Sequence, residues 1–330
     1  MGINNLSDKP CLAIDLGGTK ILTALVAPRG EVITRHLFPT DAPAGPDNVI
    51  ARITSSMEQI LHQASLTTNG IRGIGIAVAG PLDIARGIVT TSPNLPGWDN
   101  VPLCNIIRQK FNVPSFLIHD ASAAALAEHR CGAGKGTKDM LYITVSTGIG
   151  GGIIIGGKLY IGISGTAGEV GHMTIETDGP QCTCGNRGCW EMLASGTALA
   201  REAKRAIAAG RQSSILKLAG GDINKITAKT VSAAAESADI LALELVEHLG
   251  MYFGVGLANL INIFNPEMIV IGGGLSKMGN LLLAPASRTI SGRAFAISVE
   301  KVSIVLSKLV DDAGVIGAAM HVIDQTAELP

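Results

Sequence analysis

The chain has 330 residues, which is long for one hydrophobic core and comfortable for two lobes. Hydrophobic residues make up 47% of the chain and charged residues 16%, a balance that excludes an intrinsically disordered protein. With 26 basic and 27 acidic residues the formal charge is -1, which disfavours nucleic acid or an anionic membrane as a partner.

The N-terminal segment gives no sign of export. Residues 1–10 lack a basic start followed by an apolar run, which is the pattern of a secretion signal. An uncharged stretch from Met140 to Gly157 is long enough to span a membrane, but its glycines favour turns over a lipid-facing helix. We therefore expect a cytoplasmic protein that makes no membrane contact.

Short apolar runs separated by glycines follow the N-terminal segment. The runs Leu12 to Asp15, Ile21 to Ala27 and Glu31 to Leu37 predict a meander of three strands. Gly17 and Gly18 predict a tight turn between the first two strands, because glycine adopts the backbone angles that such turns require.

Helices then alternate with strands. Apolar residues recur at helical spacing from Val49 to Leu61, and Gly73 to Val78 predicts a buried strand. Ser115 to Ile118 predicts another strand, and Ala121 to Arg130 an alanine-rich helix. Such alternation is typical of an α/β lobe.

The middle of the chain repeats the order of elements seen at its start. A strand from Met140 to Ser146, a glycine turn and a strand from Gly152 to Ile155 follow one another as the elements at residues 12–27 do. This similar order is what a duplicated lobe would leave in the sequence.

The rest of the chain is mainly helical. We expect a first lobe at residues 1–118, with a C-terminal helix at 311–330 packing on it, and a second lobe at 119–310. The predicted elements of this part are helices at Trp190 to Ala209, Thr230 to Ala238 and Leu241 to Phe264, strands at Met268 to Ile271 and Val302 to Leu306, and a terminal helix at about 311–323.

The turn at residues 15–20 is a candidate phosphate site. Gly17 and Gly18 would let backbone N–H groups approach phosphate oxygens, Thr19 would add a hydroxyl donor, and Asp15 could hold a hydrated Mg2+ ion. An ordinary hairpin turn with incidental polar residues is the competing interpretation, and for this turn alone it is preferred.

Two further glycine turns favour the phosphate interpretation. Residues 146–152 repeat the arrangement, and Gly272, Gly273 and Gly274 follow a predicted strand, which suits a flat nucleobase. Neither a P-loop nor a dinucleotide fingerprint occurs. Because phosphoryl transfer depends mainly on positioning and charge neutralisation, paired glycine turns and a metal-bound carboxylate would supply the nucleotide side of such a reaction.

Asp120 follows the predicted strand at 115–118 and precedes a predicted helix. A carboxylate there could deprotonate an acceptor hydroxyl. Aspartate at such a junction is also a common helix N-cap, which on this evidence alone is the better interpretation.

A metal site is indicated by His172 and the segment CTCGNRGC at residues 182–189. One imidazole and three thiols, from His172, Cys182, Cys184 and Cys189, form the closed ligand set of structural zinc, whereas catalytic zinc keeps an open position. Glu169 and Glu191 lie close by in sequence, where a metal-pinned loop could aim them at a polyhydroxylated ligand. Solvated surface glutamates are the ordinary alternative.

Taken together, these residues resemble the ROK family of repressors, open reading frames and sugar kinases, within the hexokinase and actin-like superfamily. The block from Gly165 to Gly196 carries the most specific part of the resemblance. Further matches are DLGGTK at 15–20, Gly80-Pro81, Asn94 in SPNLPGW, STGIGGG at 146–152 and IGGG at 271–274.

The resemblance implies a two-lobed, ribonuclease H-like ATPase fold of the α/β class with a structural zinc loop, and a kinase that uses ATP with Mg2+. It implies Asp120 as the general base, with glucose as our first choice of sugar. The other roles it implies are sugar binding by Gly80, Asn94, His119, Glu169, His172 and Glu191, and nucleotide binding by Asp15, Gly17, Gly18, Thr19, Lys20, Thr147, Gly148, Gly150, Gly273 and Gly274.

One position departs from the family pattern. The family usually has Asn-Asp-Ala-Asn around the aspartate, whereas this chain has His119-Asp120-Ala121-Ser122. Histidine is bulkier than asparagine and can titrate near neutral pH, so a shifted sugar specificity or a pH-sensitive affinity is a hypothesis for this chain. N-acetylmannosamine, N-acetylglucosamine, mannose and fructose stay open as substrates.

Two other classes of function compete with that of a sugar kinase. A sugar-responsive repressor would carry a helix-turn-helix domain, for which the fourteen residues before Asp15 are too few, so we expect no nucleic-acid partner. A zinc hydrolase would need a vacant zinc position.

We expect a homodimer or homotetramer by analogy with the family, and polyphosphate remains possible as phosphoryl donor.

Overall fold

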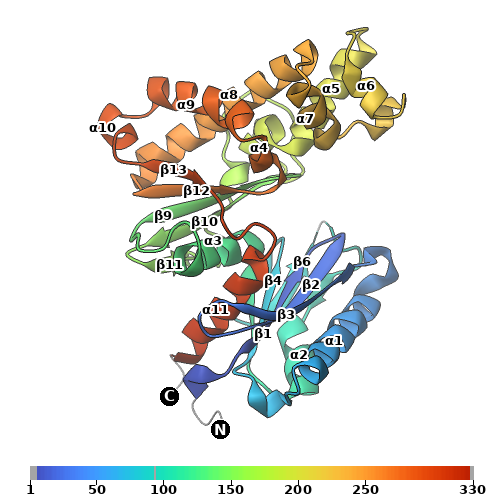
Figure 1. The fold of residues 1–330 in the computed structure, drawn as a ribbon, viewed down its shortest axis with the longest axis vertical. Helices are drawn as coiled ribbons and strands as arrows, with labels where there is room; N and C mark the ends of the chain where they lie inside the picture. The colour runs from blue at the N-terminus through green and yellow to red at the C-terminus, as the bar shows by residue number, and fades with distance from the viewer. Residues whose placement is uncertain (1–5, 93, 328–330) are drawn as a thin grey trace. The chain divides into compact units, whose positions relative to one another are not determined.

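The computed structural model describes residues 6–92 and 94–327 (Figure 1). Contacts divide the chain into two compact units, each formed from discontinuous segments. Unit 1 comprises Met1–Tyr142, Gly152–Gly168 and Ser307–Pro330, and unit 2 comprises Ile143–Gly151 and Glu169–Leu306.

Unit 1 is built on a sheet with the strand order β3-β2-β1-β4-β8. The first three strands form the predicted antiparallel meander, whereas β1, β4 and β8 run parallel. The carboxyl ends of these parallel strands therefore lie at one edge of the sheet. The strands are β1 (Cys11–Leu16), β2 (Lys20–Val26), β3 (Val32–Pro39), β4 (Ile74–Val78) and β8 (Ser115–His119).

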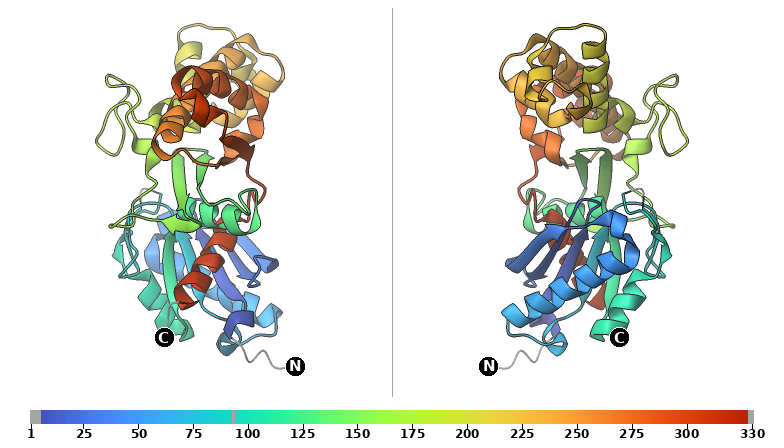
Figure 2. Two further views of the ribbon diagram at one scale, coloured as in Figure 1. Left: turned by 90° about the vertical axis from the view of Figure 1, so that its left-hand side faces the viewer. Right: turned by 90° about the vertical axis from the view of Figure 1, so that its right-hand side faces the viewer.

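Helices cover both faces of this sheet. Helix α1 (Gly45–Gln63) lies on one face, and α11 (Ala313–Ala327) on the other with α3 (Asp120–Cys131) beside it (Figure 2). The predicted helix at Val49 to Leu61 is thus confirmed. Residues 328–330, part of the expected C-terminal segment, lie outside the described residues.

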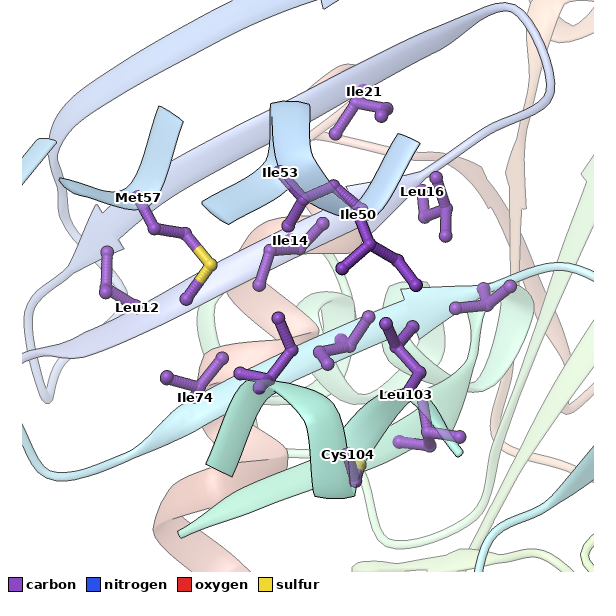
Figure 3. Packing of buried hydrophobic residues seen from close by; sticks show 14 of the residues in the cluster. Leu12, Ile14, Leu16, Ile21, Ile50, Ile53, Met57, Ile74, Leu103 and Cys104 are labelled. Carbon is purple, nitrogen blue, oxygen red and sulfur yellow. The ribbon is translucent and has the colours of Figure 1, made fainter. Parts of the chain in front are cut away.

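The core of unit 1 fills the space between the sheet and α1. Leu12 and Ile14 of β1 pack with Ile53 and Met57 of α1, and Ile74 of β4 joins them (Figure 3). All five side chains are at most 1% exposed, so their burial gives a large part of the hydrophobic stabilisation of this unit.

Several short elements of unit 1 were not anticipated. Helix α2 (Leu103–Phe111) adds its apolar side to the same core. A small antiparallel sheet contains β5 (Leu82–Asp83), β6 (Ile88–Thr91) and β7 (Asp99–Val101). These strands have two to four residues, too few for a period-2 pattern to stand out in the sequence.

The expected boundary between the lobes differs from the observed one. Residues 119–142 and 152–168 were expected in the second lobe, but their contacts place them in unit 1. The reason is the close packing of α3 on α11. A Cβ atom added to Gly317 of α11 would lie 1.8 Å from the carbonyl oxygen of Ala123, so the two backbones touch there.

A second sheet has the strand order β11-β10-β9-β12-β13, and the division between the units falls within β9 and β10. Numbered along the chain, its strands follow the same order as those of the first sheet. The inference of a duplicated lobe is therefore confirmed at the level of strand order. The strands are β9 (Met140–Val145), β10 (Ile149–Ile155), β11 (Lys158–Tyr160), β12 (Met268–Gly272) and β13 (Ser303–Leu306).

The remainder of unit 2 is helical, as expected. Its α-helices are α4 (Trp190–Ala194), α5 (Gly196–Ala208), α6 (Ser214–Leu218), α7 (Ala228–Glu236), α8 (Ile240–Phe264), α9 (Asn280–Arg293) and α10 (Ala296–Val299). Short 3-10 helices in the two units are η1 (Leu6–Asp8), η2 (Ala42–Ala44), η3 (Thr68–Gly70), η4 (Val170–His172), η5 (Ile223–Lys225) and η6 (Gly274–Met278).

The predicted single helix at 190–209 is wrong in one respect, because it breaks at Ser195. The backbone of Ser195 is extended, with φ -97° and ψ 171°, and its side chain accepts a hydrogen bond from Ala198 N–H. Ser195 is therefore the N-cap of a new helix, α5, as serine commonly is.

Helix α8 is the central helix of unit 2. Its glycines permit close packing: a Cβ atom on Gly250 would lie 2.3 Å from Pro285, and one on Gly256 would lie 2.1 Å from the ring of Trp190. Within the described residues, α8 meets the length and hydropathy expected of a membrane-spanning helix, and half of its most apolar window is buried inside the structure.

Candidate active site and metal centre

Three predicted site segments of unit 1 meet at the carboxyl edge of its parallel strands. The register aligns Leu16 of β1 with Val78 of β4 and Val78 with His119 of β8. The first glycine turn follows β1, Gly80 follows β4, and Asp120 follows β8. Ligands of open α/β sheets bind at such an edge, so this edge is a candidate site.

The first glycine turn is held by a neighbouring threonine. Gly17 N–H donates to the carbonyl oxygen of Lys20 at 3.1 Å, and the hydroxyl of Thr40 donates to the carbonyl oxygen of Gly17 at 2.6 Å. A Cβ atom on Gly18 would lie 2.5 Å from Cβ of Asn94, so a predicted sugar-binding residue touches the predicted phosphate turn. A cavity of about 400 Å³ beside the turn is lined by Asp15, Gly17, Lys20, Leu22, Arg35, Leu37, Asp311 and Asp312.

The carboxyl group of Asp15 lies in an environment that disfavours its charged form. The pKa of its carboxyl is raised to about 7: burial contributes most to the rise, the negative charge of Asp120 adds to it, and Lys20 opposes it. Gly314, near the start of α11, lies against this carboxyl group: a Cβ atom there would be 2.5 Å from Oδ2 of Asp15. A bound cation would offset the unfavourable charge, so the environment of Asp15 fits Mg2+.

Asp120 is the first residue of α3, and the N-cap is His119. The N-cap interpretation of Asp120 is therefore wrong. Its Oδ1 accepts a hydrogen bond from Ala121 N–H at 2.7 Å and lies 3.1 Å from Nδ1 of His119. The side chain is 40% exposed, so its second oxygen has room to accept a proton from a ligand.

The second and third glycine turns lie against each other in unit 2. A Cβ atom on Gly273 would lie 2.4 Å from the carbonyl oxygen of Val145, and one on Gly274 would lie 3.6 Å from Oγ of Ser146. Gly273 has φ +85°, a conformation that favours glycine. The two turns thus form one backbone surface, as a nucleotide site requires.

The start of α5 supports the second glycine turn from behind. Gly196 N–H donates to the carbonyl oxygen of Ser146 at 2.7 Å, and the hydroxyl of Thr197 donates to the backbone carbonyl oxygen of Thr147 at 2.8 Å. Sequence reasoning missed these two residues because it placed them inside a continuous helix. The Ser-Gly pair at 195–196 was the signal for a new helix start.

The four predicted metal ligands converge. The ligand atoms of His172, Cys182, Cys184 and Cys189 all lie within 4.8 Å of one another. His172 Nδ1 is 3.6 Å from Sγ of Cys182, and Sγ of Cys184 is 3.7 Å from Sγ of Cys189. Ligands about 2.3 Å from a tetrahedral zinc ion are separated by about 3.7 Å, so the cluster fits zinc.

Two glutamates flank the metal-ligand cluster. Oε1 of Glu191 lies 3.4 Å from Sγ of Cys182 and 3.6 Å from Nδ1 of His172, whereas Oε2 of Glu169 lies 3.9 Å from Nε2 of the same ring. Glu191 also reaches the second glycine turn, since a Cβ atom on Gly148 would lie 2.7 Å from its Oε2. One ring nitrogen of His172 thus faces the thiols and the other faces Glu169.

The predicted site residues fall into two groups, one in each unit. Unit 1 holds Asp15, Gly17, Gly18, Thr19, Lys20, Gly80, Asn94, His119 and Asp120. Unit 2 holds Thr147, Gly148, Gly150, Glu169, His172, Cys182, Cys184, Cys189, Glu191, Gly273 and Gly274.

The comparison with known proteins agrees with the sequence resemblance. The model of the ROK family matches residues 11–325. The chain is 36% identical to a glucokinase of Halalkalibacterium halodurans, with 97% of each chain covered. It is also 36% identical to a xylose repressor of Caldicellulosiruptor bescii, over 97% of this chain and 79% of the repressor.

A solved structure shows the same fold. It is a ROK family glucokinase from Streptomyces griseus in complex with glucose and AMPPNP, with a TM-score of 0.81 and 34% sequence identity, covering 94% of this chain and 98% of that one. The predicted fold class is therefore confirmed.

Proposed function

The chain belongs to the ROK family, and we propose that it transfers the γ-phosphoryl group of ATP to a hydroxyl of a hexose, with glucose as the sugar and glucose 6-phosphate as the product. Two relatives support this proposal. The Halalkalibacterium halodurans relative is a glucokinase, and the Streptomyces griseus structure contains glucose and an ATP analogue.

The observation that carries the proposal is the acidic pair of unit 1. Asp15 and Asp120 lie at the same sheet edge, and the charge of Asp120 raises the pKa of the partly buried Asp15 carboxyl. Two interacting carboxylates are unfavourable for stability, and a protein that only binds sugar has no need of them. Phosphoryl transfer needs both a base for the acceptor and an anchor for a cation.

In the proposed reaction Asp120 is the base. The free oxygen of its carboxylate accepts the proton of the sugar hydroxyl as the hydroxyl oxygen bonds to the γ-phosphorus. The bond from the γ-phosphorus to the bridging oxygen breaks, and ADP leaves with the electron pair. Ala121 N–H and His119 hold the other oxygen of Asp120, which fixes the direction of the base.

The nucleotide is proposed to bind the glycine turns. Backbone N–H groups at Gly17, Gly18 and Gly148 would donate to phosphate oxygens, with Thr19 and Thr147 adding hydroxyl donors. Mg2+, held through Asp15, would neutralise charge on the phosphates. Gly273 and Gly274 would lie against the adenosine, where glycine leaves room for a flat base.

Sugar hydroxyls are proposed to bind Asn94, Glu169, His172 and Glu191. Zinc bound by the cluster would fix η4 and the start of α4, which carry three of these side chains. Because four protein ligands would occupy all the coordination positions of a tetrahedral zinc ion, its role here is structural.

The test is ADP release with Mg-ATP and a panel of glucose, mannose, fructose, N-acetylglucosamine, N-acetylmannosamine and xylose. Glucose should give the highest kcat/KM. Xylose has no sixth carbon and should give no 6-phosphate. A chain that releases no sugar-dependent ADP with any member of the panel, or with polyphosphate as donor, is not a sugar kinase.

A sugar-sensing regulator is the second candidate, because the chain is as similar to a xylose repressor as to a glucokinase. Retention on DNA at moderate salt that xylose or glucose releases would favour this candidate. Sugar-dependent turnover without such retention favours the kinase.

We also propose a cytoplasmic homodimer or homotetramer. Ile263, Phe295 and Ile297 of unit 2 are 66%, 72% and 72% exposed, and such side chains are commonly covered in oligomers. Sedimentation of the purified protein as a monomer at micromolar concentration would contradict this part of the proposal.

A further inference from the structure

Glu128 is a buried carboxylate that the proposed chemistry does not use. Its side chain is 0% exposed, and it lies near the end of α3, the helix that Asp120 begins. A carboxylate removed from water is costly unless several donors replace its hydration, so its retention in a core needs an explanation.

The donors that surround Glu128 come from two places. Oε2 accepts a hydrogen bond from Ala133 N–H at 2.7 Å, just beyond the end of its own helix. Oε1 accepts from the hydroxyl of Ser307 and from the backbone N–H groups of Lys308 and Leu309, both at 2.9 Å. One oxygen therefore holds three consecutive residues that lie 179 to 181 positions away in the sequence.

The residues held by Glu128 lead directly into α11. Ser307 is the first residue of unit 1 after β13, and its hydroxyl also accepts a hydrogen bond from Val310 N–H. Four residues of the connection are thus fixed before α11 begins at Ala313. The position of the start of α11 relative to α3 is set by this hydrogen-bonded group.

The start of α11 in turn borders the acidic pair. Gly314 lies against the carboxyl group of Asp15, and Gly317 lies against the backbone of Ala123 in α3. Glu128 thus connects the helix that carries Asp120 to the segment that contacts Asp15. Movement of the 307–310 connection would change the space around Asp15.

We propose that Glu128 is a positioning residue of the kinase: it sets the distance between the carboxylates of Asp15 and Asp120 through the 307–310 connection and Gly314. This inference rests on the proposed function. A displacement of about 1 Å between reacting groups is enough to reduce turnover about a hundred-fold, so a distant anchor can matter.

The chain offers a matched control for a purely stabilising role. Arg130 of α3 forms an ion pair with Asp324 of α11 at 2.8 Å, so it joins the same two helices. The two side chains are 41% and 36% exposed, and exposed ion pairs contribute little to stability. Arg130→Gln removes a link between the helices but leaves the 307–310 connection in place.

The test compares Glu128→Gln with Arg130→Gln in the full chain. Glutamine has one acceptor oxygen, so it leaves either Ala133 N–H or the three donors at 307–309 facing an NH2 group. Glu128→Gln should speed hydrogen exchange across residues 307–317 and lower kcat about ten- to hundred-fold. The KM values for sugar and ATP should stay within about three-fold, because binding groups are intact. Arg130→Gln should match the wild type in all three measurements.

Two results would overturn the inference: a kcat within about two-fold of wild type in Glu128→Gln, or an equal loss of kcat in Arg130→Gln.

If Glu128→Gln does not fold, Ser307→Ala decides, because it removes one donor. A reduced kcat at an unchanged melting temperature supports the proposal, and wild-type kcat overturns it. An inactive wild-type chain would contradict the proposed function, while the exchange comparison would still show whether Glu128 holds residues 307–317.

Discussion

At the scale of single residues, the candidate site is characterised by the different environments of its two aspartate side chains. Asp15 and Asp120 are both aspartates at the same sheet edge. Asp15 is partly buried and its pKa is raised, whereas the side chain of Asp120 is 40% exposed and accepts a backbone hydrogen bond. These environments suit different tasks, a cation anchor for Asp15 and a proton acceptor for Asp120.

The raised pKa of Asp15 predicts a pH-dependent contribution to stability. The folded pKa is about 7 and the ordinary value is 3.8, so between these values the folded chain holds a proton that the unfolded chain has lost. The free energy of unfolding from this group therefore falls as pH rises from about 4 to 7, by up to about 4 kcal/mol. Without Mg2+, Asp15→Asn should stabilise the protein at pH 8 and leave it nearly unchanged at pH 4.

Urea unfolding at these two pH values, for both proteins, measures the effect. An equal difference between wild type and Asp15→Asn at both pH values would show that Asp15 does not titrate in this range.

At the scale of elements, Glu191 joins the metal-ligand cluster to the second glycine turn. It contacts Cys182 and His172 through one oxygen and approaches Gly148 with the other. Removal of zinc by a chelator should therefore speed hydrogen exchange of amides at 146–150 as well as at 172–191. The first glycine turn in unit 1 is the internal control.

Mass spectrometry of exchanged peptides gives this comparison without any activity measurement. Faster exchange confined to residues 172–191 would show that the cluster does not support the turn.

Helix packing in unit 2 gives a paired prediction about glycines. Gly256→Ala should destabilise the protein by about 1–3 kcal/mol, because the added methyl group would overlap the ring of Trp190, which is 0% exposed. Gly292→Ala in α9 meets no atom within 4 Å and should stabilise by up to about 1 kcal/mol. Thermal unfolding measures both. Equal melting temperatures for the two variants would contradict this packing.

The elements also show what the sequence could reveal. Long periodic segments such as α1 and α8 were predicted as helices, because their buried faces repeat at helical spacing. The bounds of α8 were predicted closely, whereas α1 begins at Gly45 and not at Val49. The break at Ser195 was not predicted, because alanine-rich sequence continues past it. The helix breaks there because Gly196 N–H forms a tertiary hydrogen bond with the carbonyl oxygen of Ser146. Strands β5 to β7 were missed for lack of length.

At the scale of the whole molecule, both sheets share one strand order, which the repeated strand, glycine turn, strand pattern had indicated. The distribution of segments between the units could not be read from the sequence. It depends on long-range contacts such as those of Glu128 with residues 307–309, and no local pattern marks a buried carboxylate in an alanine-rich helix. The metal ligands were readable because cysteine spacing is itself the signal.

The most direct test of the account is the turnover of Asp120→Asn with glucose and Mg-ATP. Asparagine keeps the size of the side chain and can still accept the hydrogen bond from Ala121 N–H, but it cannot take a proton. We predict a kcat lowered about 100- to 10,000-fold, with KM values and melting temperature close to those of the wild type. A kcat within about two-fold of the wild type would contradict the assignment of Asp120 as the base.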